Sequence, residues 1–428
     1  MNMRLYNLGD GKSQLSFKQA LRKAIAPDGS LYYPYEIPKF SKNEIDSLAN
    51  LDQKQIALLV LGKCLGEEIP QNDLLKIVDT ACSFSTPLKK VADRYVLELF
   101  HGPTMAFKDV AARYLAALMS YFKSENEKLT VLVATSGDTG GAIAQGFANI
   151  AGISVVILFP KDRVSQLQYE QLTRVADNVS SVEVAGSFDD CQSLVKQAFA
   201  RNELSEQLGL TSANSISIGR LIPQIIYYVD AYAQLAKDNI RFTVPTGNLG
   251  NLSAGLLAWK MGIPIKQFIS ANNQNDALNR YLKTDIYNPN ESVHTLSSAM
   301  DVGAPNNLPR FKAIFNNDIK QARAMVSADK IDDEQTIETI KYVYERYGYL
   351  LDPHTAVAWA ACDKQLNDNY TDIIVATSSA IKFSKEIESV SGIHIDNKKE
   401  LEKLNSMPRR LMRINNSFDE FEGLLRSL

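Results

Sequence analysis

Lys108 is the residue in this chain whose setting most favours covalent chemistry. It follows a strand-like run, Tyr95 to Phe100, and the turn residues His101-Gly102-Pro103, and it begins a segment with apolar residues at every fourth position. Apolar neighbours disfavour the ammonium form and lower the pKa of a lysine. A neutral amine can condense with an aldehyde, so Lys108 is a candidate Schiff-base residue. The alternative is an ordinary lysine whose amine extends to water.

Two glycine-rich turns are candidate anion sites. Thr135-Ser-Gly-Asp-Thr-Gly-Gly141 follows the strand-like run Leu129 to Ala134, and Pro245-Thr-Gly-Asn-Leu-Gly-Asn251 follows Phe242 to Val244. Glycine lets the backbone approach a ligand, and free amides at a helix start bind phosphate or carboxylate. The second turn has neither GxGxxG nor GxxxxGK spacing, so a cofactor phosphate fits it better than NAD or ATP. A helix-capping turn without a ligand remains the alternative for each.

Polar residues also follow two further extended segments. Asn214 and Arg220 lie six residues apart, and an arginine offers a planar fork to phosphate or carboxylate. Thr377, Ser378 and Ser379 follow the run Asp372 to Ala376 and are suited either to bond a heterocycle nitrogen or to cap the next helix. A reactive lysine together with a phosphate cradle is typical of pyridoxal phosphate. The second anion site then suggests a phosphorylated substrate.

The elements that must position these residues alternate between strand and helix. Apolar, β-branched runs at Ile153 to Phe159, Ser181 to Val184 and Ile265 to Ile269 are typical of strands buried on both faces. Helical segments separate them, including those expected at Ala142 to Asn149 and Leu252 to Met261. This alternation predicts an α/β protein with mostly parallel sheets, in which ligands bind at the carboxyl ends of strands.

Bulk properties exclude several classes of function. The chain has 428 residues, which is more than one compact core usually holds. Its formal net charge of −3 gives no excess of positive charge that would bind nucleic acid or an anionic membrane. Its four cysteines show no CxxC pair and its four histidines no metal-ligand spacing, so no metal site is expected. No signal core and no membrane-spanning run is evident, which favours a cytoplasmic location.

Several of these segments together resemble the threonine synthase family of pyridoxal-phosphate (PLP) enzymes. They are Leu97 to Asp109, Ala134 to Gly140, Ser212 to Ile216 with Arg220, Gly247 to Asn251, Met300-Asp-Val with Pro305-Asn-Asn307, Gly29 to Pro34, and Asp352 to Ala358. The resemblance implies a tryptophan-synthase-like fold (fold type II) with two open, mostly parallel sheets flanked by helices. It also implies a mostly helical region at 1–85, a large PLP-binding domain from 86–125 with 215–395, a small domain at 126–214 and a helical tail at 396–428.

The implied activity is conversion of O-phospho-L-homoserine and water to L-threonine and phosphate by γ-elimination and β-addition, the last step of threonine biosynthesis. Lys108 would form the Schiff base and shuttle protons. The implied cofactor-binding residues are Lys108, Gly247, Asn248, Leu249, Gly250, Asn251, Thr377 and Asp138. The implied substrate-binding residues are Thr135, Ser136, Gly137, Thr139, Asn214 and Arg220. No nucleic-acid or membrane partner is expected, and the sequence leaves monomer and homodimer open.

The chain departs from the family pattern after the last predicted strand. The usual run Gly-Thr-Ala-His-Pro-Ala-Lys-Phe reads Ala376-Thr-Ser-Ser-Ala-Ile-Lys-Phe383 here, and Leu249 replaces a common phenylalanine. Two alternatives therefore stay open. One is a related PLP-dependent lyase that eliminates phosphate and releases 2-oxobutyrate. The other is a non-catalytic protein that retains the fold.

Overall fold

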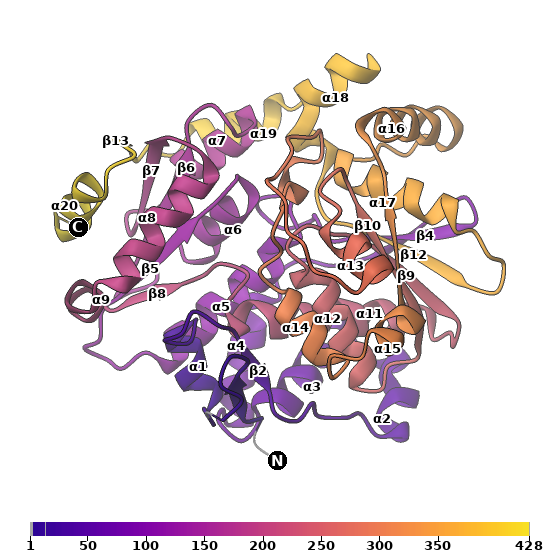
Figure 1. Cartoon of the computed structure of the whole chain (residues 1–428), viewed down its shortest axis with the longest axis horizontal. Helices are drawn as coiled ribbons and strands as arrows, with labels where there is room; N and C mark the ends of the chain where they lie inside the picture. Colours follow the sequence, from indigo (N-terminus) through magenta and orange to yellow (C-terminus); the bar gives the residue numbers. More distant parts are fainter. Residues whose placement is uncertain (1–2, 13, 428) are drawn as a thin grey trace.

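The computed structural model describes residues 3–12 and 14–427, which form two open sheets surrounded by helices. Figure 1 shows the smaller sheet on the left, near the C-terminus, and the larger sheet on the right, with the N-terminal helices below. This arrangement confirms the predicted α/β class with two mostly parallel sheets.

The larger sheet has six strands in the order β11-β10-β9-β12-β4-β3. All neighbours are parallel except β3, which pairs antiparallel with β4. The strands are β3 (Leu88–Val91), β4 (Arg94–Glu98), β9 (Ile240–Pro245), β10 (Ile265–Asn272), β11 (Val326–Lys330) and β12 (Thr371–Ala376). The helical elements between and around them are α5 (Lys108–Phe122), α10 (Ile218–Leu221), η2 (Ile222–Gln224), α11 (Ile225–Leu235), α12 (Gly250–Lys260), α13 (Ala277–Thr284), η3 (Ser298–Met300), α14 (Leu308–Ile314), α15 (Ile319–Met325), α16 (Asp333–Tyr347), α17 (Pro353–Lys364), η4 (Ala380–Phe383) and α18 (Ser384–Ser391).

The smaller sheet has five parallel strands in the order β13-β7-β6-β5-β8. Its elements are β5 (Leu129–Ala134), α6 (Asp138–Gly146), β6 (Ile153–Pro160), α7 (Gln166–Thr173), β7 (Val179–Ala185), α8 (Phe188–Ala200), α9 (Asn202–Leu208), β8 (Leu210–Ser212) and β13 (Leu411–Asn415). Helix α6 begins four residues earlier than the sequence predicts. The reason is that the Thr135 hydroxyl accepts hydrogen bonds from the amides of Gly137 (3.0 Å) and Gly140 (2.9 Å) and so stabilises an early helix start.

The sequence predicts a helical tail at 396–428, but the tail is helical only in part. It contains α19 (Lys398–Asn405) and α20 (Phe418–Ser427), but between them β13 adds an edge strand to the smaller sheet. Arg413 on this strand pairs with Glu183 of β7, with Nε and Oε2 2.7 Å apart. Charged side chains are common on edge strands. Because this segment is charged, its sequence did not predict a strand.

The N-terminal region contains short helices and one small antiparallel ribbon in which Leu5 pairs with Pro34. Its elements are β1 (Leu5–Asn7), α1 (Phe17–Lys23), β2 (Tyr32–Pro34), α2 (Lys42–Ser47), η1 (Leu48–Asn50), α3 (Gln53–Leu65) and α4 (Gln71–Ala81).

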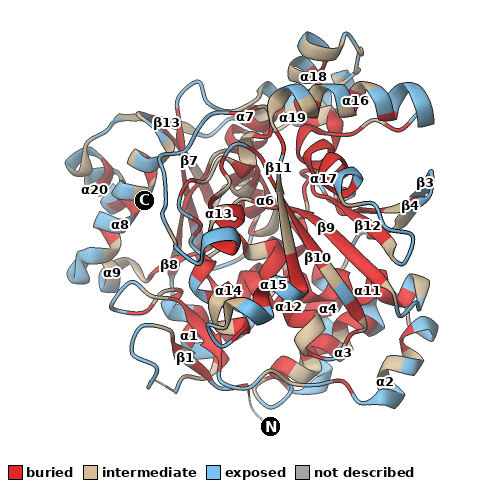
Figure 2. Cartoon of the chain, turned by 45° about the vertical axis from the view of Figure 1, so that its right-hand side comes forward, coloured by how far each residue is buried: buried red, intermediate tan, exposed pale blue. Residues whose placement is uncertain are grey.

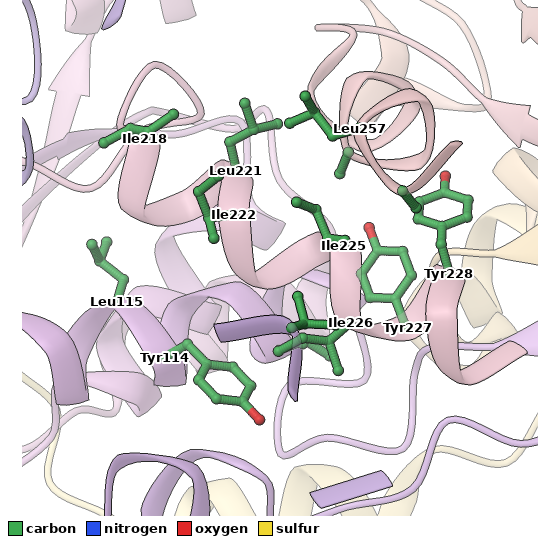
Figure 3. Close-up of a cluster of buried hydrophobic side chains, with 14 of the residues drawn as sticks. Tyr114, Leu115, Ile218, Leu221, Ile222, Ile225, Ile226, Tyr227, Tyr228 and Leu257 are labelled. Atoms are coloured by element: carbon green, nitrogen blue, oxygen red, sulfur yellow. The ribbon is translucent and has the colours of Figure 1, made fainter. Parts of the chain in front are cut away.

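The core fixes the helices that carry the candidate site. In Figure 2, β9, β10 and β12 are coloured mostly as buried, while α16 and α8 carry exposed residues. In Figure 3, Tyr114 and Leu115 of α5 lie close to apolar side chains of α10, η2 and α11, among them Ile222 and Ile226, and Leu257 of α12 lies on the far side. Removing one such buried aliphatic side chain costs about 2–5 kcal/mol in comparable cores. Helices α5 and α12 therefore pack into the same core, which limits their movement relative to each other.

Candidate active site

One cavity of about 610 Å³ opens where the turns after β5, β9 and β12 meet the start of α5. This is the place that a pair of parallel sheets predicts for a ligand, because the strand ends converge there. The cavity wall includes nearly all the residues implied by the resemblance, namely Lys108, Thr135, Ser136, Asp138, Thr139, Asn214, Arg220, Gly247, Asn248, Leu249, Gly250, Asn251 and Thr377. Gly137 does not line it and instead packs against Gln168, which a β-carbon would approach to 2.6 Å.

Lys108 is the first residue of α5, and its side chain is 14% exposed, toward the cavity. The preceding segment is tied to the end of β12. Phe107 donates its amide to the Thr377 carbonyl (2.9 Å), and the Ser379 amide donates to the Met105 carbonyl (3.1 Å). Met105 has a positive φ of 55°, an uncommon conformation for methionine that these contacts hold in place. Burial lowers the pKa of Lys108, the Lys382 and Arg220 charges lower it further, and Asp138 opposes them.

Asp138 lies between two lysines at the start of α6. Its Oδ2 is 3.5 Å from Lys108 Nζ, and its Oδ1 is 2.6 Å from Lys382 Nζ. Gln168 also donates to Oδ1 at 2.9 Å. Burial disfavours the charged carboxylate, but Lys382 and Lys108 outweigh burial and hold the pKa of Asp138 well below its usual range. A permanent negative charge therefore stands beside the Lys108 amine.

The turn from Gly247 to Asn251 forms a cradle at the start of α12. Leu249 has a left-handed backbone (φ 61°) and directly precedes the helix, and the first residues of the helix line the cavity. A β-carbon at Gly247 would come within 2.8 Å of the Met300 backbone, so only glycine fits. The Asn251 amide oxygen accepts hydrogen bonds from the hydroxyls of Tyr227 and Tyr228, both at 2.7 Å. Its Nδ2 is buried without a partner, which leaves a donor at the cavity wall.

Arg220 and Asn214 form a second polar group on the same cavity. Arg220 is buried, donates from Nη1 to the Ala213 carbonyl at 2.8 Å, and has no partner for its Nε. Burial lowers the pKa of Arg220 to about 10, so the side chain is still cationic at neutral pH. A buried cation with an unused donor is costly unless a ligand supplies an anion. Asn214 adds a buried amide oxygen without a partner.

Other cavity residues were not assigned a site role from the sequence. Met300 and Asp301 line the wall, and the segment that carries them is fixed by His354, whose Nε2 accepts from the Ala299 amide at 3.1 Å. Asp352 holds the other ring nitrogen of His354 at 2.7 Å. The motifs Met300-Asp-Val and Asp352-Pro-His are visible in the sequence, but nothing in their pattern shows that they meet. Residues of α8, including Gln192 and Lys196, complete the wall from the smaller sheet.

Residues 84–378 match the family described as "Pyridoxal-phosphate dependent enzyme", and residues 8–82 match "Threonine synthase N terminus". Threonine synthase from Haemophilus influenzae is 40% identical over 427 residues and covers 99% of both chains. The chain belongs to the threonine synthase family. It is thus a PLP-dependent lyase.

Solved structures of the threonine synthase family agree closely with this fold. The Escherichia coli enzyme superposes with a TM-score of 0.93 at 39% identity, covering 99% of this chain and all of that one. The PLP-bound threonine synthase of Brucella melitensis also gives 0.93, at 34% identity, covering 100% of this chain and 99% of that one. Tomato threonine deaminase, at 17% identity and a TM-score of 0.57, shares the fold alone.

Neither a metal centre nor a membrane-spanning helix is found among the described residues. No group of three or more His, Cys, Asp or Glu side chains there is arranged to hold a metal ion. Among the same residues, no helix is long and apolar enough to cross a membrane.

Proposed function

We propose that this chain converts O-phospho-L-homoserine and water to L-threonine and phosphate, with pyridoxal phosphate held in the 610 Å³ cavity. The observation that carries the proposal is that the Lys108 amine and two separate anion-binding groups open onto one cavity. One group is the cradle of Gly247 to Asn251, and the other is the Arg220 guanidinium, with Asn214 on the same cavity wall. A cofactor phosphate and a substrate phosphate would each have a place.

The cradle fits the cofactor phosphate. The first amides of α12 and the unpartnered Asn251 Nδ2 are donors at a helix N-terminus, where a phosphate is favoured. Thr377 lines the cavity at the end of β12 and offers a hydroxyl for the cofactor ring. When bound, pyridoxal phosphate supplies an aldehyde for amines and a ring that delocalises charge from the substrate carbons.

Lys108 would take and return protons at the substrate carbons through its Nζ. Its lowered pKa keeps a share of the amine neutral, which a base requires. The amine lies at the first residue of a helix held by the core, while its side chain reaches into the cavity, so one group can serve successive proton transfers. Asp138 beside it would stabilise the ammonium each time the amine has accepted a proton.

Arg220 would bind the substrate phosphate and stabilise it as a leaving group. Its Nε has no protein partner, and Ser136, Thr139 and Asn214 line the same wall. Charge-assisted hydrogen bonds to a departing anion strengthen as negative charge develops on it, which lowers the barrier to its loss.

The test is an assay of the purified protein on O-phospho-L-homoserine in which threonine, 2-oxobutyrate and phosphate are all quantified. Threonine and phosphate in equal amounts are expected. If 2-oxobutyrate is the main product, the chain is the related phospho-lyase. If neither product forms and the protein shows no cofactor absorbance, the chain is the non-catalytic alternative.

A further inference from the structure

Lys382 is buried beside the candidate site but does not line the cavity. It lies in η4, after the Ser378-Ser379-Ala380 turn, and its side chain has no exposed surface. Its Nζ is 2.6 Å from Asp138 Oδ1 and forms an ion pair with it. Its backbone carbonyl accepts a hydrogen bond from the hydroxyl of Ser165, the residue that caps the start of α7, at 2.9 Å.

The two lysines share the Asp138 carboxylate unequally. Lys382 is 0.9 Å nearer to it than Lys108 is, since the two distances are 2.6 and 3.5 Å. Lys382 also has the greater need of a partner, because its side chain is 0% exposed and that of Lys108 is 14% exposed. A buried charge without a partner is far more costly than a charge that reaches a polar cavity. The Asp138 carboxylate therefore pairs more strongly with Lys382 than with Lys108.

The surrounding charges point the same way. Lys108 on α5 faces Asp138 from α6, Lys382 from η4 and Arg220 from α10. Asp109, next in sequence, faces Lys382 as well, but Thr104 already donates to both of its carboxylate oxygens, and burial raises the pKa of Asp109. Two lysines thus face Asp138, and of these two Lys108 is the one whose amine opens onto the cavity.

We propose that Lys382 is a positioning residue that keeps the Asp138 carboxylate paired with itself and so leaves the Lys108 amine free to react as a nucleophile and base. The inference rests on the proposed role of Lys108. It assigns Lys382 no contact with substrate or cofactor. Removing the Lys382 charge would give Asp138 wholly to Lys108 and hold that amine as an ammonium ion.

The test measures how fast Lys108 reacts in the full-length protein after removal of the cofactor. Trace acetic anhydride labels neutral amines, and mass spectrometry of the Lys108 peptide gives the labelling rate from pH 6 to 11. Lys382→Met, which keeps the length of the side chain but not its charge, is expected to label Lys108 about tenfold more slowly at pH 8, equivalent to an upward pKa shift of about one unit. Lys382→Arg is expected to stay near the wild-type rate.

Asp138→Asn provides the opposite change, because it removes the anion and leaves the cations. Lys108 in this variant is expected to label faster than in wild type. A purely structural role for Lys382 would shift both variants in the same direction. The matched control is Lys385→Met, an exposed lysine on α18, whose Lys108 labelling should match wild type.

The inference is overturned if folded Lys382→Met protein labels Lys108 at the wild-type rate or faster. Should Lys382→Met fail to fold by circular dichroism, the polar but uncharged Lys382→Gln decides: slower labelling of Lys108 supports the inference, and unchanged or faster labelling rejects it. Labelling is independent of turnover. Protein that labels as expected yet makes no threonine would therefore contradict the proposed function alone.

Discussion

Lys108 Nζ and Asp138 Oδ2 lie 3.5 Å apart, at the outer limit of a hydrogen bond, in a site that is largely shielded from solvent. The pair joins the two sheets, since Lys108 begins α5 beside the larger sheet and Asp138 begins α6 on the smaller one. At this distance the carboxylate can stabilise a protonated amine without holding it in a tight ion pair. The chemistry of the site therefore depends on how the two sheets are placed relative to each other.

Replacing Lys108 with alanine should abolish turnover and the cofactor absorbance band. Lys108 is assigned as both the base and the nucleophile of the site, so the loss is expected to be on the order of 10³-fold or more. Steady-state assay and an absorbance spectrum measure the two effects. Lys385→Ala, on the exposed face of α18, is the matched control and should retain both. Turnover retained by Lys108→Ala would refute the assignment of this lysine.

Replacing Arg220 with alanine should weaken use of the substrate far more than binding of the cofactor. A hydrogen bond to a charged group contributes about 1.5–3 kcal/mol, so kcat/KM for O-phospho-L-homoserine should fall roughly 10- to 150-fold. The Kd for pyridoxal phosphate, measured by fluorescence titration, should change by less than about threefold, a shift below 1 kcal/mol. A variant that loses the cofactor and keeps its affinity for phosphohomoserine would show that the two phosphate sites are exchanged.

Replacing Gly247 with alanine should weaken cofactor binding. The new β-carbon would approach the Met300 backbone to 2.8 Å, and backbone cannot move aside as a flexible side chain can. Overpacking of this kind costs about 1–3 kcal/mol, which corresponds to a 5- to 150-fold higher Kd for pyridoxal phosphate if the cradle itself is displaced. Gly62→Ala on α3 is the control, because its β-carbon would approach the Leu74 side chain of α4 only to 3.9 Å, an ordinary contact distance. Equal cofactor affinity in the two variants would contradict the role of the cradle.

The residues that sequence reasoning placed in the site share one property: they follow runs whose apolar pattern marks buried strands. Lys108, Thr135, Gly247 and Thr377 each come soon after such a strand, and parallel strands bring their carboxyl ends to one edge. The local pattern was therefore enough to group them. Their individual roles toward cofactor and substrate stay predictions.

The contacts that sequence reasoning missed are made between elements far apart in the chain. The Lys382–Asp138 pair joins residues 244 positions apart, since 382 − 138 = 244, and the His354–Ala299 contact depends on a loop with no periodic pattern. Strand β13 was missed because its Arg413 and its partly exposed neighbours match a surface segment. No local signal reports such pairings, because they are decided by packing of the whole fold.

The last prediction concerns stability and uses a buried carboxylate away from the site. Asp230 on α11 is 6% exposed and accepts hydrogen bonds at its Oδ2 from Thr86 (2.8 Å) and Gln234 (3.0 Å). Burial raises the pKa of Asp230 to about 6, above its value in the unfolded chain. The folded protein therefore holds this proton more tightly, and stability that is present at pH 4 is lost as pH rises toward and through 6.

Asp230→Asn can accept both hydrogen bonds without ionising, so its free energy of unfolding should match that of wild type near pH 4 and exceed it above pH 6 by on the order of 1–3 kcal/mol. Thermal unfolding of both proteins from pH 4 to 8 measures the difference, with the exposed Asp368→Asn as control. A constant difference between Asp230→Asn and wild type across this range would show that Asp230 does not titrate with a raised pKa.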